Sequence, residues 1–149
     1  MNMTRQSACQ SDVIALLGQL DAYFAALYPA ESNHLMDIAS LTGPEGAFLV
    51  ARDAHGKLAA CGAYVARGAY AEVKRIVVDP AFRGQGIGGL LLAKMVARAR
   101  ADGFDSLKLE TGISQPEALG LYRRDGFTEI EPFGHYQLDP LSIFMEKRL

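Results

Sequence analysis

Most of the information about this chain lies in one short stretch, Arg83-Gly84-Gln85-Gly86-Ile87-Gly88-Gly89. It places four glycines between an apolar strand and a leucine-rich helix. Glycine lets the backbone approach a ligand closely and present its N–H groups, and a helix start adds unpaired N–H groups and the positive end of the helix dipole. Because Arg83 adds a positive charge, the stretch predicts a cradle for a phosphate or pyrophosphate group.

A dinucleotide-binding site is the first alternative. Gly84, Gly86 and Gly89 also satisfy the pattern G-x-G-x-x-G, and Glu110 follows about twenty residues later, as the dinucleotide fingerprint requires. In such domains, however, the first glycine follows the strand directly, whereas residues 79–83 intervene here and too little chain follows for further βαβ units. A P-loop is excluded because no Gly-Lys-Ser/Thr follows the glycines. The sequence therefore argues against a dinucleotide-dependent oxidoreductase.

The spacing of apolar residues predicts helices first, then strands, then an alternation of helix and strand. This order predicts one domain over residues 1–149, of α/β (mixed α+β) class, built on a mixed sheet. The expected strands cover 3–8, 47–52, 57–67, 69–78, 106–110, 127–130 and 142–147. The expected helices cover 12–28, with a cap at Ser11, and also 35–40 and 86–101. A fourth expected helix begins at a capping box, Ser114–Glu117, and ends at Asp125. In the helix over 86–101, the side expected to be buried carries Ile87, Leu90, Leu91, Met95 and Ala99.

Two motifs resemble those of the GNAT superfamily, the Gcn5-related N-acetyltransferases. Arg83-x-x-Gly86-x-Gly88 resembles the family's R/Q-x-x-G-x-G/A pyrophosphate motif, and residues 118–127, ALGLYRRDGF, resemble its A-x-x-L-Y-x-x-x-G-F block. The resemblance covers residues 46–149 well and the N-terminal helices only loosely. It implies the GNAT fold, in which a twisted, mostly antiparallel sheet flanked by helices contains a splayed parallel strand pair that binds acyl-CoA.

The resemblance also implies a reaction, the direct transfer of an acetyl group from acetyl-CoA to a primary amine, with no metal. It assigns the general acid to Tyr122 and the general base to Glu72; a tyrosine packed in the core and a carboxylate facing solvent are the structural alternatives. Gln115 stands where the family often has an asparagine that contacts the pantetheine arm, and it keeps the amide on a longer side chain. The residues assigned to acetyl-CoA are Ile76, Val77, Val78, Arg83, Gly84, Gln85, Gly86, Ile87, Gly88, Gly89 and Gln115.

The acyl acceptor is expected between the first helices and the last loop. Tyr28 opens a Tyr-Pro-x-Glu stretch, Glu110 an E-T-G-x-x-Q block and Tyr136 a Y-x-x-D-P-L-S tail, which resemble segments of a small bacterial GNAT subgroup of unassigned substrate. The expected acceptor is a small-molecule amine such as an amino acid, and ordinary loop polarity is the alternative explanation of these segments. The residues expected to contact the acceptor are Tyr28, Glu31, His34, His135 and Tyr136.

Composition narrows the class of protein further. A net charge of −2 argues against a nucleic-acid partner, which usually requires a basic face, and no apolar run is long enough to predict a membrane span. Cys9 and Cys61 are too few for a disulfide framework, so a reduced, cytoplasmic location is expected. The histidines show no metal-ligand spacing.

The function class that competes with an enzyme is a CoA-binding sensor or regulatory module that has lost catalysis. Tyr122 and Glu72 favour the enzyme, because a sensor has no need of an acid and a base. Homodimers are common in the family, and the sequence leaves the oligomeric state open.

Overall fold

The structure is a computed structural model, which describes residues 1–28 and 46–149. One seven-stranded sheet has the strand order β1-β2-β3-β4-β5-β7-β6, and the β4–β5 pair is parallel whereas its other neighbouring strands are antiparallel. This is the mixed, mostly antiparallel α/β fold that the sequence predicts. The elements are β1 (Asn2–Arg5), α1 (Ser11–Leu27), β2 (Gly46–Arg52), β3 (Leu58–Arg67), β4 (Tyr70–Val78), the 3-10 helix η3 (Pro80–Phe82), α2 (Ile87–Ala101), β5 (Ser106–Gly112), α3 (Pro116–Arg124), β6 (Thr128–Ile130) and β7 (Ser142–Arg148).

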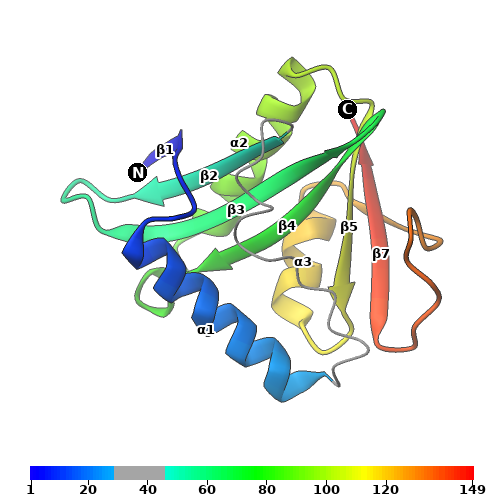
Figure 1. Ribbon diagram of the computed structural model, residues 1–149, viewed down its shortest axis with the longest axis horizontal. Coiled ribbons are helices and arrows are strands. Elements are labelled where there is room, and N and C mark those ends of the chain that lie inside the picture. The colour runs from blue at the N-terminus through cyan, green and yellow to red at the C-terminus, as the bar shows by residue number, and fades with distance from the viewer. Residues whose placement is uncertain (29–45) are drawn as a thin grey trace.

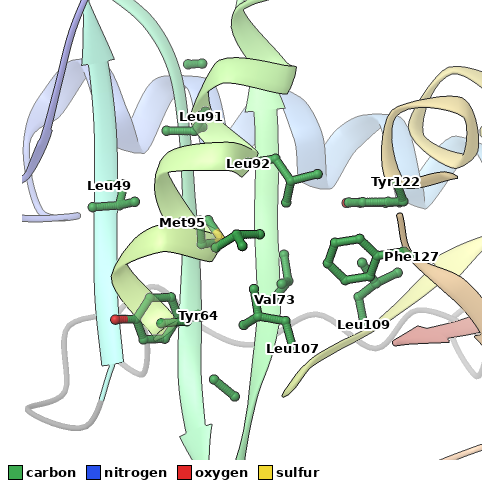
Figure 2. Close-up of a cluster of buried hydrophobic side chains, with 14 of the residues drawn as sticks. Leu49, Tyr64, Val73, Leu91, Leu92, Met95, Leu107, Leu109, Tyr122 and Phe127 are labelled. Carbon is green, nitrogen blue, oxygen red and sulfur yellow. The ribbon is translucent and has the colours of Figure 1, made fainter. Parts of the chain in front are cut away.

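Helices cover both faces of the sheet (Figure 1). α1 packs on one face through Val13, Leu16 and Leu17, which helical periodicity places on one side. α2 and α3 cover the other face, where Leu91 and Met95 of α2 meet the strands (Figure 2). Burying such a side chain stabilises the fold by about 1.5–3 kcal/mol, so each helix is fixed to its face mainly by these contacts.

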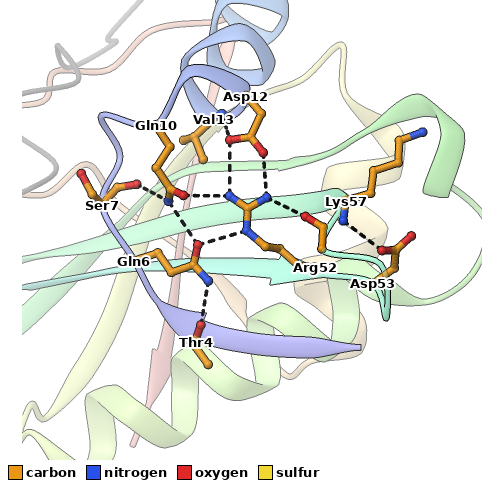
Figure 3. A network of polar contacts seen from close by, with 10 residues as sticks. Thr4, Gln6, Ser7, Gln10, Asp12, Val13, Arg52, Asp53 and Lys57 are labelled. Carbon is orange, nitrogen blue, oxygen red and sulfur yellow. Dashed lines mark hydrogen bonds and ion pairs between the residues drawn. The ribbon is translucent and has the colours of Figure 1, made fainter.

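The start of α1 is held by the guanidinium of Arg52 at the end of β2 (Figure 3). Its nitrogens lie 2.7 Å from Asp12 Oδ2, 3.0 Å from Gln10 Oε1 and 3.1 Å from Gln6 Oε1. Gln10 precedes the helix, and its side chain contacts Arg52 and does not cap α1. Because Arg52 also donates to the carbonyl of Gly56, this network joins the β1–α1 connection to the β2–β3 hairpin and fixes where α1 starts on the sheet.

The parallel strands β4 and β5 pair only where they begin. Residues 70–72 pair with residues 106–108, and the strands then diverge (Figure 1). β5 remains paired with β7 to its end, and β4 remains paired with β3 as far as Val78. The sheet is therefore split between residues 73–78 of β4 and residues 109–112 of β5, a feature called the wedge below. It is the splayed parallel pair that the sequence predicts.

A β-bulge at Arg75 lies at the wedge. Opposite Gly62, β4 carries one residue more than β3, and Arg75 has a left-handed backbone with φ 62°. A Cβ at Gly62 would lie 2.8 Å from Ile76 Cγ1, so the bulge comes too close for any larger residue there. Because a bulge bends and twists its strand, we attribute the divergence of β4 from β5 to this extra residue.

Three predictions about the helices are wrong. Ser11 is the first residue of α1, not its cap. α3 begins at Pro116 without a side-chain cap, so the capping box at Ser114 does not form; proline at the first helical position has no N–H that a cap would satisfy. Leu90 is 57% exposed, because it lies on the side of α2 opposite to Leu92, which is buried.

Candidate active site

The glycine stretch joins η3 to α2 at the end of β4. Gly84 and Gly86 have φ angles of 78° and 76°, the left-handed region that glycine adopts without a Cβ penalty, and residues 84–86 are exposed. The first amide bonded within α2 is that of Leu90, which donates to Gly86 O at 3.1 Å. The amides of residues 87–89 are first-turn groups without intrahelical acceptors, which makes them available to an anion.

At the other two glycines a Cβ would meet its neighbours at ordinary van der Waals distances. A Cβ on Gly88 would lie 3.4 Å from Val78 Cγ2 and 3.5 Å from Leu121 Cδ2, and one on Gly89 would lie 3.8 Å from Leu121 Cδ1. The N-terminus of α2 is thus positioned between the end of β4 and α3, at the open end of the wedge. Arg83 is exposed at the same place, and its Nε donates to the carbonyl of Val78 at 3.3 Å.

The β4 edge that faces the wedge includes Ile76, Val77 and Val78. Ile76 and Val78 pack against the core on the α2 side, whereas Val77 is buried in the core on the α1 side. The side chains therefore point away from the plane of the sheet, and the backbone of this edge faces β5 without a strand partner. Such an edge can hydrogen-bond an extended ligand as it would a further strand.

Tyr122 lies on α3 beside the wedge. Its ring packs on Phe127, with centroids 5.7 Å apart, and Figure 2 shows its hydroxyl directed toward β4. Burial, with a smaller contribution from the charge of Glu110, raises the pKa of the Tyr122 phenol. The hydroxyl forms no hydrogen bond with residues 1–28 or 46–149. The structure thus places a protonated phenol, held by core packing, at the wedge.

Glu72 is almost fully buried, at 1% exposed, so it is not a carboxylate facing solvent. Its Oε2 accepts a hydrogen bond from the Tyr136 hydroxyl at 2.5 Å and lies 3.1 Å from Lys74 Nζ, while its Oε1 lies 3.2 Å from Arg67 Nε. Lys74 also donates to the Tyr136 oxygen at 2.6 Å. Burial, with the carboxylate of Glu72, raises the pKa of Tyr136. Glu72 therefore lies in a hydrogen-bonded network.

Tyr28, at the end of α1, reaches the far wall of the wedge. Its hydroxyl accepts a hydrogen bond from the Ser114 N–H at 3.2 Å and from Gln115 Nε2 at 3.4 Å. The hydroxyl also occupies the space beside Gly112, where a Cβ would lie only 1.7 Å from it. Burial raises the pKa of Tyr28. Tyr28 and Gln115, two residues singled out from the sequence for separate tasks, are thus in contact.

The remaining candidates for acceptor contacts divide into two groups. His135 is exposed and stacks on Tyr136, with centroids 4.7 Å apart. Glu31, His34 and the helix predicted over 35–40 lie outside the described residues. The structure therefore brings Glu72, Tyr136 and His135 together on the α1 face, whereas Tyr122 approaches the wedge from the α3 face.

Lys74 was not predicted as a site residue, and Glu110 was predicted only as part of a motif. Glu110 lies on β5 just beyond the last pair with β4, and its Oε2 accepts a hydrogen bond from Ser142 Oγ at 2.7 Å. A signal for both was present, because period-two alternation puts Lys74 on the same strand face as Glu72, and Glu110 begins the E-T-G-x-x-Q block. What alternation cannot show is that Tyr136 bridges Lys74 and Glu72.

No group of three or more His, Cys, Asp or Glu side chains within residues 1–28 and 46–149 could hold a metal ion. Within the same ranges, no helix has the length and apolar character to cross a membrane.

The wedge of this α/β protein brings together the first-turn amides of α2, the unpaired edge of β4 and the buried phenol of Tyr122. This arrangement suits an extended, phosphate-bearing ligand. A model of the acetyltransferase (GNAT) family matches residues 15–127, which is more than half of the chain. The chain belongs to the GNAT family of acetyltransferases, and it is an acyltransferase enzyme. This assignment argues against the inactive sensor.

The chain is similar to proteins of known sequence or structure over nearly its whole length. It is 47% identical to the IAA acetyltransferase of Azospirillum brasilense, over 100% of this chain and 98% of that protein. A solved structure from Klebsiella pneumoniae, provisionally assigned as an acyl-CoA N-acyltransferase, has a TM-score of 0.84 at 36% identity and covers 99% of this chain and 97% of its own. A GNAT acetyltransferase from Elizabethkingia anophelis with acetyl-CoA bound shares the fold, with a TM-score of 0.69 at 20% identity over 99% and 97% of the two chains.

Proposed function

We propose that the protein transfers an acetyl group from acetyl-CoA to the primary amine of a small molecule, such as an amino acid or a related amine. The observation that carries the proposal is the wedge, an unpaired strand edge next to a helix start with available amides. The acetyltransferase relative from Azospirillum brasilense and the acetyl-CoA bound by the Elizabethkingia anophelis protein support it.

The residues around the wedge fit acetyl-CoA, which supplies an activated thioester. The amides of residues 84–89 and the guanidinium of Arg83 would hold the pyrophosphate, since Arg83 and residues 84–86 are exposed and residues 87–89 form the first turn of α2. The edge over residues 76–78 would pair with the amides of the pantetheine arm. Gln115, half-buried at the start of α3, would contact the same arm from the β5 wall.

Tyr122 would be the general acid. Since burial raises its pKa, the phenol keeps its proton at neutral pH and can give it to the thiolate sulfur as the carbon–sulfur bond breaks. The same wedge edge of β4 would offer a backbone N–H to the carbonyl oxygen, on which negative charge develops.

Glu72 would be the general base, and its surroundings suggest that it acts through Tyr136. Three donors surround the Glu72 carboxylate, and one of them is the Tyr136 hydroxyl. The ammonium form of the acceptor would pass one proton to the Tyr136 oxygen while the Tyr136 proton passes to Glu72 Oε2, which leaves the neutral amine that attacks the acyl carbon. The amine nitrogen then forms its bond to the acyl carbon with no charge left on the tyrosine.

The acceptor would bind on the α1 face, where Tyr136 and the exposed ring of His135 lie. Glu31 and His34 remain predicted contacts of the acceptor. Tyr28 borders the same region, although its hydroxyl is already engaged by Ser114 and Gln115.

Thermal unfolding with acetyl-CoA, and with NADH as control, tests the proposal first. A ligand at 100 times its Kd adds about 2.7 kcal/mol of stability, which raises the Tm of a domain of this size by about 5–10 °C. Release of free thiol from acetyl-CoA is then measured with a panel of amines and amino acids. No shift with acetyl-CoA, or a larger shift with NADH, would rule out the proposed ligand.

The proton path has its own test. Tyr136→Phe removes the hydroxyl between Lys74 and Glu72, whereas Tyr70→Phe changes a neighbouring tyrosine that packs on Phe133. We expect the first variant to lower kcat and to change the pH–rate profile, and the second to do neither. Equal profiles in both variants would exclude Tyr136 from the path.

A further inference from the structure

Helix α1 contacts both walls of the wedge. Near its middle, the Asp21 carboxylate binds the guanidinium of Arg75 at the β4 bulge. At its end, Tyr28 binds the start of α3. The two residues are about two helical turns apart, so they lie on the same side of the helix and about 10 Å apart along its axis. Figure 1 shows α1 running across β4 toward the end of β5.

The contact with the β4 wall is made at the bulge itself. The Arg75 side chain is only 4% exposed, although Arg75 has the left-handed backbone of the bulge. A left-handed backbone is costly for a residue with a Cβ and persists only where the surroundings hold it. The ion pair with Asp21 is one contact that holds it, and it comes from α1.

The contact with the β5 wall is made where β5 ends. Gly112 is the last residue of β5 and has no space for a side chain, because the Tyr28 hydroxyl lies there. The same hydroxyl accepts hydrogen bonds from Ser114 and Gln115, which lead into α3. Tyr28 therefore ties α1 to the residues that set the direction of the α3 start.

We propose that α1 is a strap across the wedge, which fixes the separation of β4 and β5, and that Tyr28 is a positioning residue for acetyl-CoA on this strap. The role of acetyl-CoA rests on the proposed function. Without the Tyr28 contact, the β5 wall and Gln115 lose their fixed distance from the β4 edge. The pantetheine arm, which must meet both walls, then binds more weakly, while the reacting groups themselves are unchanged.

The first experiment compares Tyr28→Phe with Tyr23→Phe, a tyrosine of the same helix that is 50% exposed. Steady-state kinetics give KM for acetyl-CoA and kcat for each variant. Loss of the hydrogen bonds to Ser114 and Gln115 is expected to raise KM about three- to tenfold. Because the Tyr28 hydroxyl is engaged by Ser114 and Gln115, we expect the change to fall mainly on KM for acetyl-CoA, measured at saturating acceptor, and less on kcat. A KM equal to that of Tyr23→Phe would overturn the proposal.

The second experiment uses the space at Gly112. Gly112→Ala should displace Tyr28 and raise KM, whereas Gly120→Ala, which meets nothing within 4 Å, should not. In a Tyr28→Ala background the clash is gone, so adding Gly112→Ala should change KM little further. An equal effect of Gly112→Ala in both backgrounds would contradict the strap.

Hydrogen exchange separates failure of the strap from failure of the proposed function. The Ser114 amide is bonded to Tyr28, so its exchange should become faster in Tyr28→Phe and stay unchanged in Tyr23→Phe, whether or not a ligand is present. If the wild-type protein does not bind acetyl-CoA, the proposed function is wrong, and the exchange data alone decide on the strap. If exchange is the same in both variants, the strap is wrong even for an active acetyltransferase.

Discussion

The fit of Gly62 against the β4 bulge makes one prediction that can be worked from distances. In Gly62→Ala the new methyl group would lie 2.8 Å from Ile76 Cγ1, 3.2 Å from Met95 Cε and 3.3 Å from Ile76 Cα. The end of the Met95 side chain can move, but the Ile76 Cγ1 atom lies close to the backbone of the bulge, and the Ile76 Cα is itself near. Overpacking of this kind lowers the free energy of unfolding by about 1–3 kcal/mol. Replacing glycine by alanine within a strand raises it by about 0.5–1 kcal/mol. We therefore expect a net loss of about 1 kcal/mol, within a range of about 0–2.5 kcal/mol.

The assay is thermal unfolding followed by circular dichroism. At about 2–4 °C per kcal/mol for a domain of this size, a loss of about 1 kcal/mol in Gly62→Ala should lower Tm by about 2–4 °C. The matched control is Gly18→Ala in α1, where a Cβ meets nothing within 4 Å. That change should raise the free energy of unfolding by about 0.5–1 kcal/mol, because alanine favours a helix interior. If both variants raise Tm, the close approach of the bulge to β3 is refuted.

Three further predictions concern single side chains. Tyr122→Phe should lower kcat about 100-fold with KM for acetyl-CoA unchanged, as thiol release measures; full turnover would end its role as acid. Burial raises the pKa of Cys61 to about 12, whereas Cys9 is exposed. A thiol reagent at pH 8 should therefore modify Cys9 in the native protein and Cys61 only after denaturation. Modification of both cysteines in the native protein would contradict this. A hydrogen bond from Arg52 holds the pKa of Asp12 below its ordinary value, so the stabilising contribution of Asp12 is present above about pH 4 and is lost as pH falls through the lowered folded-state pKa. Because this carboxylate is 47% exposed, Asp12→Asn should cost only about 0.5 kcal/mol in urea unfolding at pH 7 and almost nothing near pH 2; a constant difference would disprove the link to Arg52.

The elements of the fold could be predicted to within a few residues because their signals are local. The periodicity of α1, the turn at residues 53–56 and the glycine stretch each depend on neighbours in the chain. The cap at Ser11 and the capping box at Ser114 were wrong, because a helix can begin one or two residues away from its cap signal. Pro116 begins α3 and has no N–H that a cap at Ser114 would satisfy.

The candidate site was predicted unevenly for the same reason. The glycine stretch and Tyr122 follow from motifs with fixed spacing, so their positions in the chain were sufficient to single them out. The surroundings of Glu72 were not predictable, since Tyr136 is 64 residues away in the chain and reaches it only through the loop before β7. Alternation puts Glu72 and Lys74 on one face of the strand, but the closure of that face by Tyr136 requires the folded chain.

The sequence by itself predicted the family, the order of the elements and the position of the glycine stretch Arg83–Gly89, because their signals lie in consecutive residues. Only the tertiary structure decided where β4 leaves β5, which side chains surround Glu72 and how α1 joins the two walls of the wedge. Strand pairing, burial and the Tyr28 contact across 86 residues are properties of distant segments brought together. Their free energies depend on distances that appear only when the chain is folded.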